Sequence, residues 1–270
     1  LTKGAPEVLK PLFTSVPDTY DAVSTQLMQA GMRILALGHR LLPKDLKASA
    51  LRKLPREEVE TGLTFAGFAV FECPIKAGTP EAILTLRNAS HRVVMITGDN
   101  ELTAAHVALA TRMMDQDPAF LRCDPGPPRW VDYDGETIDC VDTGSHDRCV
   151  SGEHLAAALK ADPDWLHMWA QKVAVFARCT PDQKESIITA LKSQGARTLM
   201  CGDGTNDVGA LKQAHVGVAL LNAQVDRPTP AHRAQSRLGF EEEEEEEAGE
   251  PAKEDGVQGE EGGGASLAAA

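Results

Sequence analysis

The sequence predicts an α/β fold built on a doubly wound parallel sheet, and two observations support this. Short apolar runs alternate with helix-like segments between residues 72 and 222, with turn residues between them. Such alternation is typical of parallel βαβ units. Polar motifs also follow three of the apolar runs directly, at the edge where open α/β sheets bind ligands.

The first run, at residues 93–96, predicts a buried strand that ends in Thr97-Gly98-Asp99, and a helix is expected over 101–113. A hydroxyl and a backbone N–H at the start of a helix can hold a phosphate group. Taken singly, Thr97 is more often a helix N-cap than a catalytic group. The neighbouring motifs therefore decide how this one is interpreted.

The second run, at residues 173–177, is followed by a sequence that favours a helix start. Thr180 can cap that helix, with Pro181 at its first position. Lys184 then lies one turn into the helix and faces the same edge of the sheet. A lysine in this position is, on its own, more often a solvated helix charge.

The third run, at residues 197–201, leads into a loop with two carboxylates. Gly202 and Gly204 allow a sharp turn, so Asp203 and Asp207 can converge on one point beyond the strand. Mg²⁺ usually recruits one or two carboxylates together with phosphate oxygens and water. Gly-Asp-Gly alone favours a plain surface turn, but three such motifs in this order favour a site for Mg²⁺ and a phosphoryl group.

The rest of the chain supplies the supporting elements. Residues 115–150 are rich in Asp, Pro and Gly and lack helical periodicity, so we expect an insertion loop there. The remaining predicted elements are helices at 20–30, 153–160 and 165–172 and strands at 33–37, 64–71 and 216–221.

The three motifs resemble those of the P-type ATPases in the haloacid dehalogenase superfamily. The resemblance implies a haloacid-dehalogenase-like phosphorylation domain over residues 72–222 that uses ATP and Mg²⁺. It implies that Thr97 and Lys184 hold the phosphoryl oxygens. It also implies a metal site in which Asp203 is the ligand and Asp207 its support. The other positions that it carries over are Gly98 and Asp99 in the catalytic loop and Gly202 and Asn206 in the cofactor loop.

The amino-terminal residues add a nucleotide-binding resemblance. Lys3-Gly4-Ala5-Pro6-Glu7 is similar to the family segment whose lysine lines the ATP pocket. Arg33 lies in a segment similar to the one whose arginine approaches the phosphates. Gly-Ala-Pro is also common turn chemistry. Residues 1–71 are thus expected to form the carboxyl-terminal part of a nucleotide-binding domain, with Lys3, Gly4 and Arg33 at the nucleotide.

The hinge between these two domains bears on the subfamily. Glu72-Cys73-Pro74-Ile75-Lys76 replaces the Asp-Pro-Pro-Arg type of hinge that most ion pumps carry, and is most similar to the endoplasmic reticulum branch of the type V subfamily. The resemblance implies an ATP-driven translocase with an aspartyl-phosphate intermediate, which moves transmembrane helices or another membrane substrate. It implies an intact protein in the endoplasmic reticulum membrane, with this portion facing the cytosol. The implied partners are a nucleotide and a membrane protein, and no nucleic acid.

The nucleophile motif of the family, Asp-Lys-Thr-Gly-Thr, does not occur in this sequence. We therefore expect a fragment that is inactive as an ATPase by itself, because covalent catalysis requires that aspartate. The strand before the nucleophile is also expected to be missing, which would leave unpaired edges on its neighbours and a weakly stable chain.

Two functions stay open beside each other, and a third is less favoured. The chain is either a piece of the translocase or a catalytically dead protein that binds nucleotide and Mg²⁺ and acts through interactions. A soluble haloacid-dehalogenase-type phosphatase would use Asp132-Tyr133-Asp134-Gly135 as its nucleophile loop. Against the phosphatase, that loop should precede Thr97, and the prolines ahead of it make a poor central strand.

The carboxyl-terminal residues 223–270 differ in composition. They hold 13 acidic against 4 basic side chains, in a chain of 270 residues with a net charge of −13. We expect a disordered tail, which can bind basic partners but is more often a solvated spacer. No apolar run in the chain reaches the roughly 18 residues of a membrane span, so we expect no transmembrane segment.

The six cysteines, at 73, 123, 140, 149, 179 and 201, include no Cys-x-x-Cys pair, and we expect them to be reduced. A metal site of Cys123, Cys140, Cys149 and His146 is the less favoured alternative, because their spacing matches no standard zinc pattern.

Overall fold

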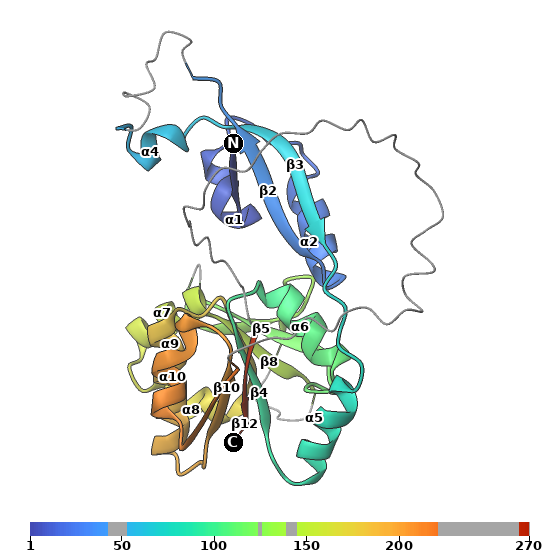
Figure 1. The fold of residues 1–270 in the computed structure, drawn as a ribbon, viewed down its shortest axis with the longest axis vertical. Helices are drawn as coiled ribbons and strands as arrows, with labels where there is room; N and C mark the ends of the chain where they lie inside the picture. The colour runs from blue at the N-terminus through green and yellow to red at the C-terminus, as the bar shows by residue number, and fades with distance from the viewer. Residues whose placement is uncertain (43–52, 124–125, 139–144, 221–264, 270) are drawn as a thin grey trace, which may run out of the picture.

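The structure is a computed structural model that describes residues 1–42, 53–123, 126–138 and 145–220, together with the backbone of residues 265–269. Two sheets organise these residues (Figure 1). One is a three-stranded sheet near the amino terminus, and the other is a nine-stranded sheet that holds all the later strands. The chain passes from the first to the second directly after strand β3 (Thr64–Phe71).

The small sheet is antiparallel, in the order β1 (Thr2–Gly4), β2 (Arg33–His39) and β3. Helix α2 (Tyr20–Gln29) covers it, and the buried Tyr20 hydroxyl donates a hydrogen bond to the Pro6 carbonyl at 2.9 Å. The predicted helix at 20–30 and the strands at 33–37 and 64–71 are confirmed. The short helices of this part are α1 (Pro6–Leu9), η1 (Lys10–Leu12) and α4 (Arg56–Val59).

The large sheet is mixed but mainly parallel. Its strand order is β11-β10-β12-β4-β9-β8-β5-β6-β7. Parallel pairs join β10 to β11 and run from β4 through β9 and β8 to β5, whereas β12, β6 and β7 pair antiparallel. The strands that the sequence predicted are β4 (Val93–Thr97), β9 (Val173–Ala177), β10 (Leu199–Gly202) and β11 (Val216–Ala219).

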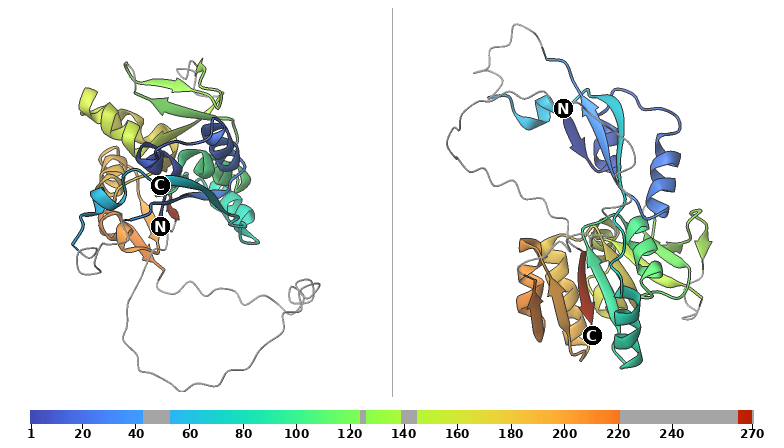
Figure 2. Two further views of the ribbon diagram at one scale, coloured as in Figure 1. Left: turned by 90° about the horizontal axis from the view of Figure 1, so that it is seen from above. Right: turned by 45° about the vertical axis from the view of Figure 1, so that its right-hand side comes forward.

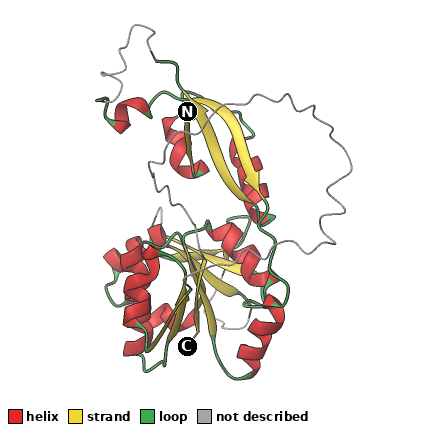
Figure 3. Cartoon of the chain, viewed as in Figure 1, coloured by secondary structure: helices red, strands yellow, loops and turns green. Residues whose placement is uncertain are grey.

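Helices cover both faces of this sheet, as Figure 3 shows. Strand β4 is buried along its whole length: Val94 and Ile96 join one hydrophobic cluster, and Val93 and Met95 join the other. An alternating side-chain direction puts successive residues of a strand on opposite faces, so both faces need apolar residues. The first cluster includes residues of α7 (Gly152–Ala161), α8 (Trp165–Trp169), α9 (Pro181–Ser193) and α10 (Val208–Gln213), and the second those of α5 (Thr79–Asn88) and α6 (Glu101–Ala110). The predicted α/β class is confirmed.

The expectation of an insertion loop over 115–150 is wrong for much of that stretch. It contains β5 (Pro118–Arg122), β6 (Arg129–Val131), β7 (Thr137–Ile138) and β8 (Asp147–Ser151), and β8 lies inside the sheet between β9 and β5. Short apolar runs such as Ala119-Phe120-Leu121 are fully buried. These runs are too short, and their flanks too rich in turn residues, for the local pattern to have indicated strands.

The carboxyl-terminal segment also differs from expectation. Residues 265–269 form strand β12 (Ala265–Ala269), so the prediction of disorder is wrong for them, while residues 221–264 of that predicted tail lie outside the described residues. Strand β12 lies between β10 and β4, which Figure 2 shows from two further directions. Unpaired strand edges were expected, but the edges of β4 and β10 that face each other are both paired with β12.

Among the helices of the described residues, none has both the length and the apolar character that crossing a membrane requires. The remaining short helical turns are η2 (Ala170–Lys172) and η3 (Thr205–Asp207).

The start of α9 tests the predicted helix cap. The Thr180 hydroxyl accepts a hydrogen bond from the Gln183 N–H at 3.3 Å, and the Gln183 side chain accepts one from the Thr180 N–H at 3.0 Å. We expect Thr180→Ala to lower the free energy of unfolding by about 1 kcal/mol, because it removes the cap. Thr189→Ala in the same helix, at an exposed position, is the control and should change it by less than about 0.5 kcal/mol. Equal effects of the two substitutions in denaturant melts would contradict the role of the cap.

Candidate active site

The carboxyl ends of β4, β9 and β10 bring the three predicted motifs to one edge of the large sheet. Backbone hydrogen bonds join the first two motifs: the Cys179 N–H donates to the Thr97 carbonyl, and the Arg178 N–H to the Asp99 carbonyl, each at 3.0 Å. Side chains of the second and third motifs meet in an ion pair between Lys184 and Asp207. Direct contacts therefore connect all three motifs at this edge.

The Lys184–Asp207 ion pair is the most buried charged contact of this edge. The Lys184 ammonium donates to Asp207 Oδ1 at 2.7 Å, and their side chains are only 4% and 2% exposed. The second oxygen of Asp207, Oδ2, accepts a hydrogen bond from the Gly204 N–H at 3.4 Å. Burial of both charges requires such pairing and hydrogen bonding. Both oxygens of Asp207 therefore have partners, as suits a support for the loop.

The loop after β10 presents one carboxylate outward. A Cβ atom at Gly202 would lie 2.7 Å from Asp207 Oδ2, so only glycine allows the loop to close over that side chain. Asp203 and Asn206 are exposed. The negative charges of Asp203 and Asp207 add to partial burial in raising the pKa of Cys201, the residue before the loop. The loop thus combines an accessible carboxylate with a buried one.

Thr97 is buried at the end of β4, with 1% of its surface exposed, and its hydroxyl accepts a hydrogen bond from the Asp99 N–H at 3.1 Å. Gly98 is open: a Cβ there would meet no atom within 4 Å, and its carbonyl accepts a hydrogen bond from Arg178 Nη1 at 3.2 Å. Asn100, not Thr97, caps helix α6, because its side chain accepts the Leu102 N–H at 2.9 Å. The N-cap role open to Thr97 on sequence grounds is therefore filled by another residue.

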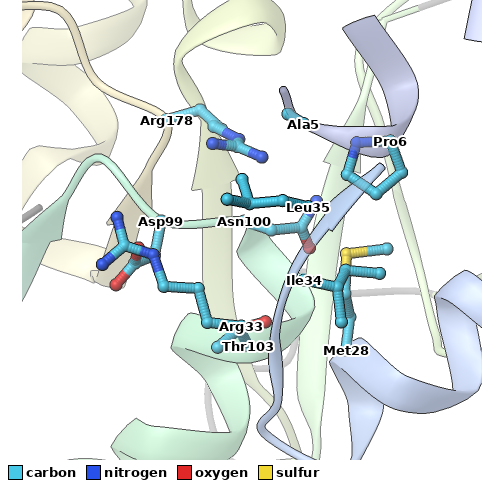
Figure 4. Close-up of a pocket in the computed structure, with 10 residues that line it drawn as sticks. All are labelled: Ala5, Pro6, Met28, Arg33, Ile34, Leu35, Asp99, Asn100, Thr103 and Arg178. Carbon is cyan, nitrogen blue, oxygen red and sulfur yellow. The ribbon is translucent and has the colours of Figure 1, made fainter. Parts of the chain in front are cut away.

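A small cavity lies between the two parts of the chain, next to this edge (Figure 4). Arg33 from β2 lies beside Asp99, with Nε 3.6 Å from Asp99 Oδ1. Arg178 Nη2 donates to Glu7 Oε1 at 2.6 Å. The two ion pairs connect the part that holds the small sheet to the loops at the edge of the large sheet. The residues that line the cavity are Ala5, Pro6, Met28, Arg33, Ile34, Leu35, Asp99, Asn100, Thr103 and Arg178.

The other predicted nucleotide residues lie elsewhere. Lys3 is exposed on β1, opposite Leu37, and neither it nor Gly4 lines this cavity among the described residues. Gly4 is packed against Leu9, whose Cδ1 lies 2.2 Å from where a Cβ would be. Of the two nucleotide-binding segments predicted near the amino terminus, the structure thus brings Arg33 to the sheet edge that carries the three motifs and leaves Lys3 apart from it.

Sequence reasoning did not single out Glu7 or Arg178. Arg178 follows β9 with a positive φ of 49°, a conformation uncommon for a residue with a side chain. It donates to groups in both parts of the chain. Its place directly after a predicted strand, inside the second motif, was the available indication.

The residues at this edge fit Mg²⁺ better than they fit a whole nucleotide. The described residues contain no group of three or more His, Cys, Asp or Glu side chains arranged around a common metal position. Mg²⁺ does not need one, since it commonly takes one or two carboxylates and completes its shell with water and phosphate. The cavity of about 100 Å³ is well below the roughly 300 Å³ at which small-molecule sites begin. ATP does not fit between the two parts as they stand.

The alternative sites proposed from sequence gain no support. Asp132 Oδ1 accepts the N–H groups of Asp134 and Glu136, each at 2.9 Å, which makes it the organiser of the β6–β7 turn. Strands β9, β8 and β5 separate that hairpin from β4, so the phosphatase interpretation is wrong about this loop's position. Cys149 is buried with its thiol near Met114, and Cys140 lies outside the described residues. The described cysteines are free thiols.

The comparison with known proteins identifies the family. Over 229 aligned residues, the chain is 45% identical to the probable manganese-transporting ATPase PDR2 of Arabidopsis thaliana. They are 42% identical over 244 residues and 41% identical over 234 residues to the endoplasmic reticulum transmembrane helix translocases of Aspergillus fumigatus and Saccharomyces cerevisiae. The chain is a homologue of type V P-type ATPases.

The match to these type V ATPases includes 82% of the chain in each case but only 18–19% of each relative. The chain therefore spans about a fifth of the length of the relatives that it matches. No family model matches the sequence. The Arabidopsis relative is named as an ATPase and the two fungal relatives as translocases, which supports the predicted enzyme class of the family. The type V resemblance drawn from the motifs is confirmed.

The buried ion pair provides a test of the site's construction. We expect Asp207→Ala to lower the free energy of unfolding by about 3–5 kcal/mol, because it leaves the Lys184 ammonium buried without that carboxylate. The control is Asp182→Ala, which removes an exposed carboxylate from helix α9, the helix that holds Lys184. The double variant Lys184→Met with Asp207→Leu should lose less than the sum of the single losses. A change below about 0.5 kcal/mol for Asp207→Ala in urea melts would contradict the pairing.

The raised pKa of the Cys179 thiol, which lies next to this edge, predicts how labelling and stability depend on pH. Burial raises the pKa of Cys179 from 9.0 to about 12, partly offset by the positive charge of Lys184. We expect iodoacetamide at pH 8 to label the exposed Cys73 far faster than Cys179, since burial restricts access to Cys179 and its raised pKa of about 12 leaves little thiolate at that pH. The folded chain favours the protonated thiol, so the free energy of unfolding should fall as pH rises from 9 towards 12. Equal labelling of the two cysteines in the native chain, measured by mass spectrometry, would contradict the prediction.

Proposed function

We propose that the chain supplies the Mg²⁺- and phosphoryl-binding edge of a haloacid-dehalogenase-like phosphorylation domain in an ATP-driven type V translocase. The observation that carries the proposal is the buried Lys184–Asp207 pair, which joins two of three strand-end motifs. A positive and a negative group held at the edge that also carries Thr97 can balance the charge of a phosphoryl group and its metal.

Each residue of the edge has a distinct role in the proposal. Asp203 binds Mg²⁺ through its exposed carboxylate, and Asp207 fixes the loop through its contacts with Lys184 and the Gly204 N–H. Lys184 and the Thr97 hydroxyl contact the phosphoryl oxygens, and the open backbone at Gly98 lets such a group approach. When bound, Mg²⁺ would neutralise phosphate charge.

The neighbouring residues shape the rest of the edge. Gly202 permits the tight loop, and Asn206 is accessible beside Asp203. Asp99 and Arg33 connect the phosphorylation domain, residues 72–222, to residues 1–71, which we assign to the nucleotide-binding domain. Lys3 and Gly4 remain proposed nucleotide contacts in a more open arrangement, because the present cavity is smaller than a nucleotide site.

The whole protein's activity follows from its family. We assign to it ATP hydrolysis through an aspartyl-phosphate, an endoplasmic reticulum membrane location with this portion in the cytosol, and the movement of transmembrane helices or another membrane substrate. Two of the relatives carry the name endoplasmic reticulum transmembrane helix translocase. The nucleophilic motif is not among these 270 residues, so they do not form the acyl phosphate alone.

Paramagnetic Mn²⁺ in place of Mg²⁺ tests the metal assignment. We expect Mn²⁺ to broaden the backbone amide NMR signals of the loop from Gly202 to Asn206, since broadening is strongest close to the ion. Asp203→Asn should reduce the apparent Mn²⁺ affinity at least tenfold, because it removes the one exposed carboxylate of that loop.

The matched control is Asp134→Asn, which alters an exposed carboxylate in the β6–β7 turn. It should leave the broadening unchanged. Broadening centred on Asp134, or unaffected by Asp203→Asn, would contradict the proposed site. Binding of Mn²⁺ at Asp203 in a full-length protein without ATPase activity would instead favour the catalytically dead alternative.

A further inference from the structure

A second cavity lies at the edge of the large sheet opposite the three motifs. Its lining includes residues from the amino-terminal ends of three parallel strands: Val93 of β4, Asp147 of β8 and Ala174 of β9. The motifs follow the carboxyl ends of their strands, so the length of the sheet separates them from this cavity. The edge that holds it faces away from the small sheet (Figure 1). Its volume of about 340 Å³ lies within the range of small-molecule sites.

The lining of this cavity is cationic, although the whole chain has a net charge of −13. Four permanently charged cations surround it, and among the described residues only one carboxylate does. A concave site lined by one sign of charge concentrates ions of the opposite sign. The ionisable residues of the lining are Arg87, Arg92, Arg148, Lys172, His146 and Asp147.

Arg92 is held in place by main-chain carbonyls. Its Nη2 donates to the Val173 carbonyl at 2.5 Å, and its Nη1 donates to the Ala170 carbonyl at 3.5 Å. These acceptors carry no net charge, so the bonds orient the guanidinium without neutralising it. Burial lowers the pKa of Arg92, partly offset by the negative charge of Asp147. Arg92 is therefore a poorly solvated cation, which a bound anion would stabilise.

Two further cations are fixed on tryptophan rings. The guanidinium of Arg148, a residue only 5% exposed, lies 5.8 Å from the ring centroid of Trp130 and 5.4 Å from that of Trp169. The Lys172 ammonium lies 4.9 Å from the Trp169 centroid. Cation–π contacts attract a cation to the ring face and leave its charge in place. Side chains from β8 and η2 are thus positioned around one cavity with their charges retained.

The acidic groups nearby do not balance these charges. Asp147 Oδ2 accepts the N–H groups of Asp115 and Gln116, at 2.8 and 2.9 Å. Asp115 in turn forms an ion pair with Arg87. Counting both carboxylates against the four cations of the lining leaves an excess of two positive charges. Like charges around one cavity repel each other, and an anion bound among them would offset that cost.

We propose that this cavity is a binding site for a phosphate-bearing anion with at least two negative charges. Guanidinium groups match phosphate oxygens with paired N–H donors, and the lining supplies three of them and an ammonium. A free phosphate compound and a lipid headgroup present this same chemistry. The inference goes beyond the proposed function, because the cavity uses none of the residues assigned to Mg²⁺ or the phosphoryl group.

Titration calorimetry with inorganic pyrophosphate tests the site, in EDTA so that Mg²⁺ takes no part. We expect Arg92→Gln to weaken binding about tenfold and Lys172→Gln about threefold, since each removes a charged donor. The matched control is Lys160→Gln, which makes the same charge change at an exposed position of α7 outside the cavity. It should change the affinity by less than about twofold, because salt screens distant charges.

The binding site for pyrophosphate must also be distinguished from the phosphoryl edge. Asp203→Asn should leave pyrophosphate binding in EDTA unchanged, and Arg92→Gln should leave the Mn²⁺ broadening of residues 202–206 unchanged. Loss of the Mn²⁺ effect with intact pyrophosphate binding would count against the proposed function alone. Loss of pyrophosphate binding in Asp203→Asn would place the anion at the phosphoryl edge and overturn this inference.

Vesicles of phosphatidylcholine and phosphatidic acid in a four-to-one ratio distinguish the two sources of phosphate. Sedimentation of the chain with these vesicles, weakened by Lys172→Gln and not by Lys160→Gln, would support a lipid headgroup. Binding of pyrophosphate without such sedimentation would support a free phosphate compound. Vesicles of phosphatidylcholine alone are the control and should not sediment the chain.

Three further outcomes would overturn the proposal. The first is that neither pyrophosphate nor the phosphatidic acid vesicles bind. The second is equal weakening by Lys160→Gln and Lys172→Gln, which would show attraction to general charge. The third is unchanged affinity in Lys172→Gln, a substitution at an exposed position that should leave folding intact and so remains informative if Arg92→Gln does not fold.

Discussion

The buried ion pair between Lys184 and Asp207 is the contact on which the candidate site depends. It links helix α9, which begins one turn before Lys184, to the loop that follows β10. A buried charge is tolerable only when it is paired and hydrogen-bonded, so each partner fixes the position of the other. Asp203, a few residues away on the same loop, is thereby held at the sheet edge that carries Thr97. One exposed carboxylate is a ligand set that suits a metal whose shell is completed by phosphate and water.

The second constraint is the contact between the two parts of the chain. Arg33 and Arg178 line a cavity of about 100 Å³, and each pairs with a carboxylate from the other part of the chain, Arg33 with Asp99 and Arg178 with Glu7. These ion pairs are partly exposed, so each contributes little to stability by itself. Partly exposed pairs of this kind are suited to an interface between domains that move relative to each other.

The third constraint lies in the middle of the sheet. Both β4 and β10 need a neighbour, because a buried strand edge with unpaired N–H and C=O groups is costly. Strand β12 meets that need by pairing its backbone with both neighbours. Unpaired strand edges were expected from the sequence, whereas in the structure the chain itself pairs the facing edges of β4 and β10. The same feature explains how a chain that matches about a fifth of its relatives' length keeps one continuous sheet.

The sequence by itself determined those features that depend on neighbouring residues. The apolar runs of β4, β9 and β10, the cap at Thr180 and the glycine at position 202 are all local, and each indicated its element or turn correctly. Tertiary structure alone decided which distant residues meet. Glu7 and Arg178 are 171 positions apart, and Lys184 and Asp207 come from different βα units. Likewise β8 and β12 became sheet strands because partners on both sides completed their backbone hydrogen bonds, and no local pattern in such short segments encodes the presence of a partner.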